Sequence, residues 1–313
     1  MTAPHAPHMP HGGASRRDEV LGLWLGLLGV FIFAITLPAT RLATGSAEAP
    51  QLSPWFVTTG RAALAGLLSV VFLLATRSPL PSAHQIKPLA LAVLGNAIGF
   101  PLLLALALRH VTTSHAAVFM ALLPLVTAAV AALVLHQRAR AGFWICAVLG
   151  SVLVVAFSLL RGGQQGHGFG LEAADLLLVG AVGAASVGYI QGAKVTPALG
   201  AERVICWMCV MALPISLPAA LWLWPAQATA AAISPSAWAG FVYVGTFSMW
   251  AGFFAWFRGL ALGGALRVSQ MQLLQPFFSI LAAIPLLGEP LDVVTLGFAA
   301  AVVATVVVGK KLS

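Results

Sequence analysis

The sequence predicts an all-α integral membrane protein, with ten transmembrane helices arranged as two inverted five-helix repeats. Of its 313 residues, 60% are hydrophobic and only 8% are charged, whereas about a quarter of the residues in soluble proteins are charged. Apolar runs of the roughly 20 residues needed to cross the hydrocarbon core recur from Val20 to the C-terminal end. Motifs in the first half of the chain return in the second half. These three observations together give the fold class.

The predicted spans are separated by Pro, Gly and charged residues. The first span follows Arg16 and Arg17 and has no Ala-x-Ala-like cleavage site, so we expect a retained helix rather than a signal peptide. Pro54 begins the second span, and Arg138 and Arg140 separate the fourth span from the fifth. The ten spans are Val20–Thr40, Pro54–Thr76, Pro88–Leu108, Thr112–Leu135, Ala141–Leu160, Leu171–Ala193, Arg203–Trp224, Ala237–Phe257, Ala265–Leu287 and Leu291–Gly309.

The distribution of basic residues predicts the orientation in the membrane. Eleven Lys and Arg residues fall on the side of the N-terminus, against Arg41, Arg109 and Arg161 on the other side. The positive-inside rule therefore places both termini in the cytoplasm, with the protein in the plasma (inner) membrane. Because the bases sit in short links between apolar spans, the net charge of +8 indicates topology and not a nucleic-acid partner. Residues 1–19 should form a disordered cytoplasmic tail, since their first part is rich in Pro, Gly and His.

An internal repeat divides the chain into residues 20–160 and 171–309. Around the fourth span the chain reads LLPLVTAAVAALVLHQRA, and around the ninth it reads LLQPFFSILAAIPLLGEPL, which aligns Pro124 with Pro276. The same offset pairs Asn96 with Ser248 in the third and eighth spans. Because each repeat has an odd number of crossings, the second copy must be inverted. Inverted repeats are typical of secondary transporters, whose substrate site lies near the membrane midplane where the halves meet.

On these residues the chain resembles the drug/metabolite transporter superfamily, specifically a protein with two EamA-type repeats. The resemblance rests on the ten spans, the Arg61 helix after APQLSPWF, the Pro-centred fourth and ninth helices, and PLLGEPL before the last helix. It implies a central cavity lined by the first, third, fourth, sixth, eighth and ninth helices, and movement of small metabolites, often outward. The chain departs from the family at His136-Gln137, where Gly-Glu is usual. In the second repeat Gly288-Glu289-Pro290 is intact, and we expect Glu289 to cap the following helix.

Candidate substrate-contacting residues come from helix faces where polar or aromatic side chains gather at helical spacing. In the ninth span Gln272 and Gln275 share such a face, and amides within a membrane need partners or water. They either line the cavity or bond neighbouring helices. In the eighth span Trp250 is the one Trp far from both predicted interfaces, although an aromatic stripe also suits packing. The candidates are Thr36, Arg61, Asn96, Met120, Tyr189, Trp250, Gln272, Gln275 and Ser279.

Arg61 is nearly alone among basic residues at membrane depth. Facing lipid it would cost on the order of 2 kcal/mol, so it should point into the protein. Two interpretations stay open. In the first, Arg61 is a structural anchor held by helix-end carbonyls, or by Glu172 and Asp175. In the second, its guanidinium supplies a bidentate fork for a substrate carboxylate.

These features predict a secondary transporter of small organic metabolites that works by alternating access, exports its solute, and could be driven by a proton or solute gradient. No acid lies near a helix centre, which disfavours lipophilic cations, and isolated bases disfavour phosphates. Neutral or zwitterionic, amino-acid-like solutes remain. No Gly-x4-Gly-Lys-Ser/Thr motif occurs, so the chain is not its own pump, and no cofactor or metal ion is expected. The alternatives are a non-transporting receptor or scaffold, or a membrane-embedded enzyme, which would need a converging nucleophile and base.

Overall fold

The regular secondary structure of the protein is helical. The computed structural model describes residues 16–134, 141–164, 173–226, 232–263, 268 and 271–312, and within them the one β-like feature is an isolated bridge between Gly45 and Pro50. Seven of the described helices are long and apolar enough to cross a membrane, and three shorter apolar helices accompany them. The all-helical fold class is therefore confirmed, whereas the count of ten crossings stays a prediction.

The first half of the described chain forms five helical passages, two of which are interrupted. They are α1 (Arg16–Thr44), α2 (Pro54–Ala75), α3 (Ala83–Ala92) with the π-helix η1 (Val93–Gly99) and α4 (Phe100–Ala107), α5 (Thr113–Met120) with α6 (Leu123–Val134), and α7 (Ala141–Gln164). Because α1 begins at Arg16, the last four residues of the predicted tail 1–19 are helical, and the rest of that tail lies outside the described residues.

The second half repeats this plan. Its helices are α8 (Ala173–Leu199), α9 (Ala201–Trp222), α11 (Pro235–Tyr243) with the π-helix η2 (Val244–Ala251) and α12 (Gly252–Gly263), the 3-10 helix η3 (Met271–Leu274) with α14 (Gln275–Leu287), and α15 (Val293–Leu312). The two π-helices fall at corresponding places in the repeat, and π-helical turns often mark functional positions. Pro124 and Pro276 each follow an interruption, because neither can donate the backbone hydrogen bond that would continue the helix.

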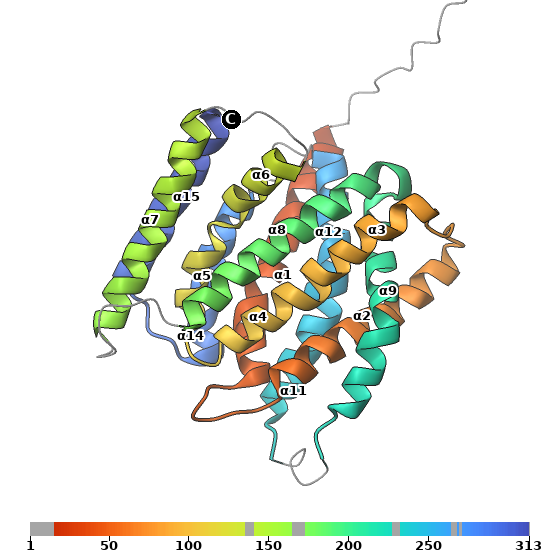
Figure 1. The fold of residues 1–313 in the computed structure, drawn as a ribbon, viewed down its shortest axis with the longest axis horizontal. Helices are drawn as coiled ribbons and strands as arrows, with labels where there is room; N and C mark the ends of the chain where they lie inside the picture. Colours follow the sequence, from red (N-terminus) through yellow and green to blue (C-terminus); the bar gives the residue numbers. More distant parts are fainter. Residues whose placement is uncertain are drawn as a thin grey trace, which may run out of the picture.

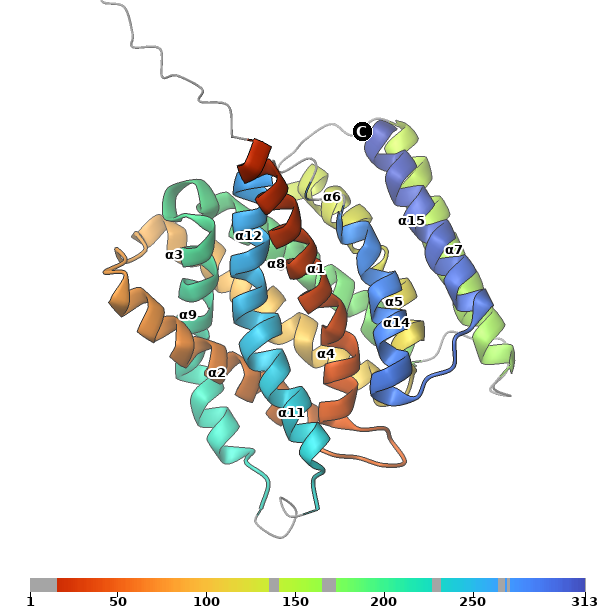
Figure 2. The ribbon, with the colours of Figure 1, turned by 180° about the vertical axis from the view of Figure 1, so that it is seen from behind.

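The packing of the helices is also duplicated. Helix α1 packs along α11, η2 and α12, as α8 packs along α3, η1 and α4, while α2 contacts α9 and α7 contacts α15. Figures 1 and 2 show α7 and α15 side by side at one edge of the molecule. Helices α1 and α8 run in opposite directions through the bundle. Arg41, near the end of α1, donates to the carbonyl of Leu108, and Asp175, near the start of α8, meets His115 just across the α4–α5 link.

Close helix crossings depend on glycine. A Cβ added to Gly259 of α12 would lie 2.6 Å from the backbone N of Gly26 in α1, and one added to Gly95 of η1 would lie 2.5 Å from the Ala184 carbonyl oxygen in α8. Small residues let membrane helices approach this closely. On the outer surface, by contrast with these crossings, large apolar side chains are exposed. Trp222 is 85% exposed and Leu74 is 73% exposed, as a lipid-facing surface requires.

Candidate substrate cavity

A large cavity, which we call the vestibule, lies between the two halves of the bundle. Its volume is about 690 Å³. Its walls run from Asn96 and Tyr189, midway along the third passage and α8, to Ala201 and Ala261, where α9 begins and α12 ends. Most of its lining is apolar, including Phe253 and several aliphatic side chains from α9. The vestibule therefore extends from the centre of the bundle to the end at which α8 turns into α9.

A smaller chamber, the inner pocket, continues the vestibule at its deep end. It measures about 60 Å³ and shares Phe33, Asn96, Leu123, Tyr189 and Phe253 with the vestibule. Its polar lining comes from six helical passages and from both halves of the chain. Those polar residues are Thr36, Arg61, Asn96, Tyr189, Ser248 and Gln275. Met120 also lines it. The structure thus brings together six of the nine sequence-predicted site residues, four from the first half of the chain and two from the second.

Arg61 is buried at the inner pocket, with 4% of its surface exposed. Its Nη2 donates to Ser248 Oγ at 3.1 Å, and that hydroxyl lies 2.8 Å from Thr36 Oγ1. Its Nε has no hydrogen-bond partner among the residues that the structure describes. Asp175, considered from the sequence as a partner, instead has its Oδ1 2.7 Å from Nε2 of His115, and Glu172 lies outside the described residues. No carboxylate in the described part of the chain forms an ion pair with Arg61.

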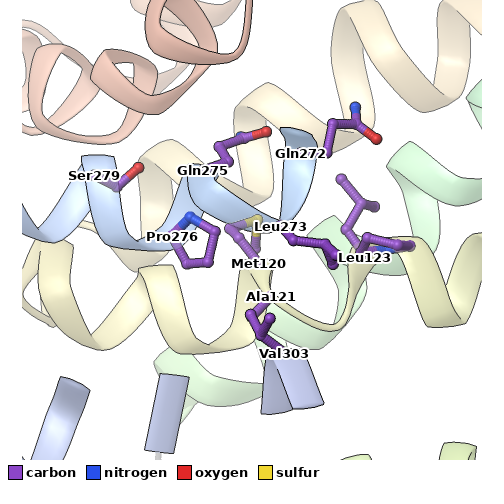
Figure 3. Close-up of a pocket in the computed structure, with 10 residues that line it drawn as sticks. Met120, Ala121, Leu123, Gln272, Leu273, Gln275, Pro276, Ser279 and Val303 are labelled. Carbon is purple, nitrogen blue, oxygen red and sulfur yellow. The ribbon is translucent and has the colours of Figure 1, made fainter. Parts of the chain in front are cut away.

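The two glutamines of the ninth passage lie on its cavity side. Gln272 lines the vestibule and Gln275 the inner pocket, and both line a third cavity of about 20 Å³ with Met120 and Ser279. Figure 3 shows both amides extending away from Ala121. Ser279 is engaged differently, because its Oγ donates to the carbonyl of Ala34 in α1 at 2.7 Å. Ser279 therefore joins two helices next to the cavity.

Trp250 does not line the vestibule or the inner pocket. Its ring packs against Phe254 and Phe72, with centroid separations of 4.7 and 6.4 Å. Phe253, which sequence reasoning missed, lines both cavities. The π-helix η2 explains this, because its wider turns rotate the following residues relative to α-helical spacing. Ser248 was also missed as an Arg61 partner, although its repeat pairing with Asn96 was a signal for it.

The end of the molecule opposite the vestibule mouth is held by Glu289. Its Oε1 accepts from Thr113 N at 2.7 Å, and its Oε2 accepts from Ser114 N at 3.0 Å and from Ser114 Oγ at 2.7 Å. Glu289 thus caps α5 of the first half, and the expected cap on the following helix is wrong. Asp292 has that role, since its Oδ2 accepts from Thr295 N at 2.8 Å at the start of α15. Gly288, in the left-handed conformation with φ of 69°, ends α14 and turns the chain toward α5.

Comparison with known proteins decides the family. Residues 20–159 match the EamA-like transporter family, and residues 172–309 match it a second time. The chain belongs to this family. The resemblance recognised in the sequence is therefore confirmed, and the EamA-like protein described here is a membrane transporter.

A curated relative and a solved structure extend the comparison. The uncharacterized transporter YdeK of Bacillus subtilis (strain 168) is 40% identical over 291 residues, which make up 93% of this chain and 97% of YdeK. A structure titled "Crystal structure of protein" aligns with a TM-score of 0.57 over 91% of this chain and 99% of that chain, at 19% identity. At that identity the second match shows that the two chains have similar folds, and nothing more.

Proposed function

We propose that the protein is a secondary transporter that moves small organic metabolites across the plasma (inner) membrane by alternating access. In this proposal its ten spans form two inverted repeats, residues 20–160 and 171–309. One observation carries the proposal. The vestibule leads from one end of the bundle to an inner pocket formed by both halves, while Glu289 holds the opposite end together. A solute path that is open on one side only is the arrangement alternating access requires.

The basic residues indicate which side of the membrane the vestibule faces. Lys194, Arg203 and Arg258 lie in or near the links at the vestibule mouth, and Figure 1 shows the start of α1 and the end of α15 at one end of the bundle. With both termini cytoplasmic, the vestibule opens to the cytoplasm. Export then begins with a cytoplasmic solute entering the vestibule. A proton or solute gradient supplies the energy.

Solute flux in proteoliposomes tests the proposal. The purified protein is reconstituted and offered labelled amino acids and other small neutral, zwitterionic and carboxylate metabolites, with empty liposomes as the control. We expect saturable movement of at least one class, and faster exchange when unlabelled solute is present on the far side. Binding without flux for every solute would instead support a receptor or scaffold.

A further inference from the structure

Arg61 has a charge that no carboxylate among the described residues neutralises. A guanidinium stays protonated in proteins, and an ionisable group buried within a membrane is normally paired or placed on a solute path. Arg61 is 4% exposed, yet the structure gives it one hydrogen bond, to the neutral hydroxyl of Ser248, and leaves Nε unbonded. Arg41 shows the contrast, because its guanidinium donates to the carbonyl of Leu108 and ties two helices together. The bond to Ser248 links α2 to η2, but it leaves the positive charge of Arg61 without a described carboxylate and most of its donors available.

The side chains around Arg61 offer further polar groups without protein partners. Asn96, Tyr189 and Gln275 line the same inner pocket, and none of the three has a side-chain hydrogen bond within the described chain. Asn96 is placed there by Gly188, since a Cβ on Gly188 would come within 2.5 Å of the Asn96 amide. The inner pocket thus combines one permanent positive charge with amide and hydroxyl groups that are free to bind a solute.

We propose that the transported solute is a small organic monocarboxylate with an apolar body, and that Arg61 binds its carboxylate in the inner pocket. This inference rests on the proposed transport function. The planar guanidinium matches a carboxylate and can donate two parallel hydrogen bonds to it. With the carboxylate at Arg61, the apolar body of the solute lies in the vestibule against Phe33, Phe253 and Met208.

The charges of the residues that line the two cavities favour a monocarboxylate over a phosphate or an amino acid. Arg61 is the one charged side chain among the described residues that line the two cavities, so a dianionic phosphate would retain an uncompensated charge. Among the described residues, the same lining contains no Asp or Glu to receive the ammonium group of an amino acid. A single carboxylate differs from a phosphate in this respect, because one Arg neutralises its charge. In this proposal the solute is a monoanion, in place of the neutral or zwitterionic metabolite expected from the sequence.

Ligand-induced thermal stabilisation of the full-length protein in detergent tests the inference without requiring transport. The probes are acetate, butyrate, benzoate and phenylacetate, each paired with its neutral amide, and phenylalanine as the zwitterion. We expect phenylacetate or benzoate to raise the Tm most, the amides to give no shift, and phenylalanine to bind more weakly than phenylacetate. Arg61→Gln should weaken carboxylate binding on the order of 10- to 100-fold, whereas the matched control Arg41→Gln should keep it.

Several outcomes would overturn the inference. They are equal stabilisation by an acid and its amide, stronger binding of phenylalanine than of phenylacetate, no stabilisation by any carboxylate, or unchanged carboxylate affinity in Arg61→Gln. Should Arg61→Gln fail to fold, Tyr189→Phe removes one pocket hydroxyl without removing charge, and an unchanged affinity in that variant would count against the site. Carboxylate binding without flux in proteoliposomes would leave this inference standing and refute the transport proposal.

Discussion

The Glu289 cap on α5 joins the two halves of the protein at the end opposite the vestibule. Replacing Glu289 with Ala removes three hydrogen bonds, from Thr113 N, Ser114 N and Ser114 Oγ. Loss of a helix cap costs about 0.5–2 kcal/mol, and each hydrogen bond to a charged group contributes about 1.5–3 kcal/mol when buried. Because Glu289 is only partly buried, we expect a total loss of about 2–3 kcal/mol.

This loss should favour opening at the Glu289 end. An energy difference of about 2–3 kcal/mol changes a two-state population ratio roughly 30- to 150-fold. Pulsed electron paramagnetic resonance can measure the opening with spin labels at Ala49 and Val293, which are exposed at this end and belong to different halves. The variant carries the labels in a background without the three native cysteines, Cys146, Cys206 and Cys209. We expect Glu289→Ala to add a longer-distance population that the unmutated background lacks.

Asp292→Ala provides the matched control. Asp292 caps α15 within its own half, so its loss should lower the Tm without changing the distance between labels in the two halves. The same distance distribution in Glu289→Ala and Asp292→Ala would show that Glu289 does not hold this end closed. Unchanged distances and Tm in Glu289→Ala would show the same.

Three further predictions follow from packing and topology. Gly259→Leu should destabilise the protein by about 1–3 kcal/mol or prevent folding, because the new side chain forces α1 and α12 apart. Gly183→Leu should be tolerated, because a Cβ at Gly183 has nothing within 4 Å, and thermal unfolding of the two variants measures the difference. Phe253→Ala should weaken solute binding up to about tenfold, because the ring lines both cavities, while Trp250→Ala should mainly lower the Tm. Equal effects of the two variants on binding would contradict the placement of Phe253 in the cavity and Trp250 outside it. A reporter active only outside the cytoplasm should give no signal at the C-terminus, and a strong signal would reverse the topology.

Much of this fold could be predicted because it depends on composition and periodicity. The apolar spans, the pairing of Pro124 with Pro276, and the pairing of Asn96 with Ser248 are all visible in the sequence. These determine which helices surround the centre of the bundle. Residues such as Asn96 and Gln275 could be selected because an amide inside a membrane needs a partner or water.

The details that escaped prediction depend on local geometry or on contacts between distant segments. The π-helix η2 rotates Phe253 toward the cavity and Trp250 away from it, and no α-helical projection anticipates that rotation. Glu289 caps a helix that lies far from it in sequence, so sequence proximity to α15 gave the wrong partner. The departure at His136-Gln137 lies outside the described residues.

In the proposed mechanism the solute passes through the vestibule, and a variant that fills the vestibule tests this most directly. Gly192 lines the vestibule, and a Cβ there would meet Val204 at 3.7 Å, an ordinary contact, so Gly192→Phe can extend into the cavity without moving the backbone. The measurement is counterflow of a labelled solute in proteoliposomes that contain either the wild-type protein or this variant. We expect the variant to keep its Tm and lose solute flux. Flux at the wild-type rate through a folded Gly192→Phe variant would contradict the account.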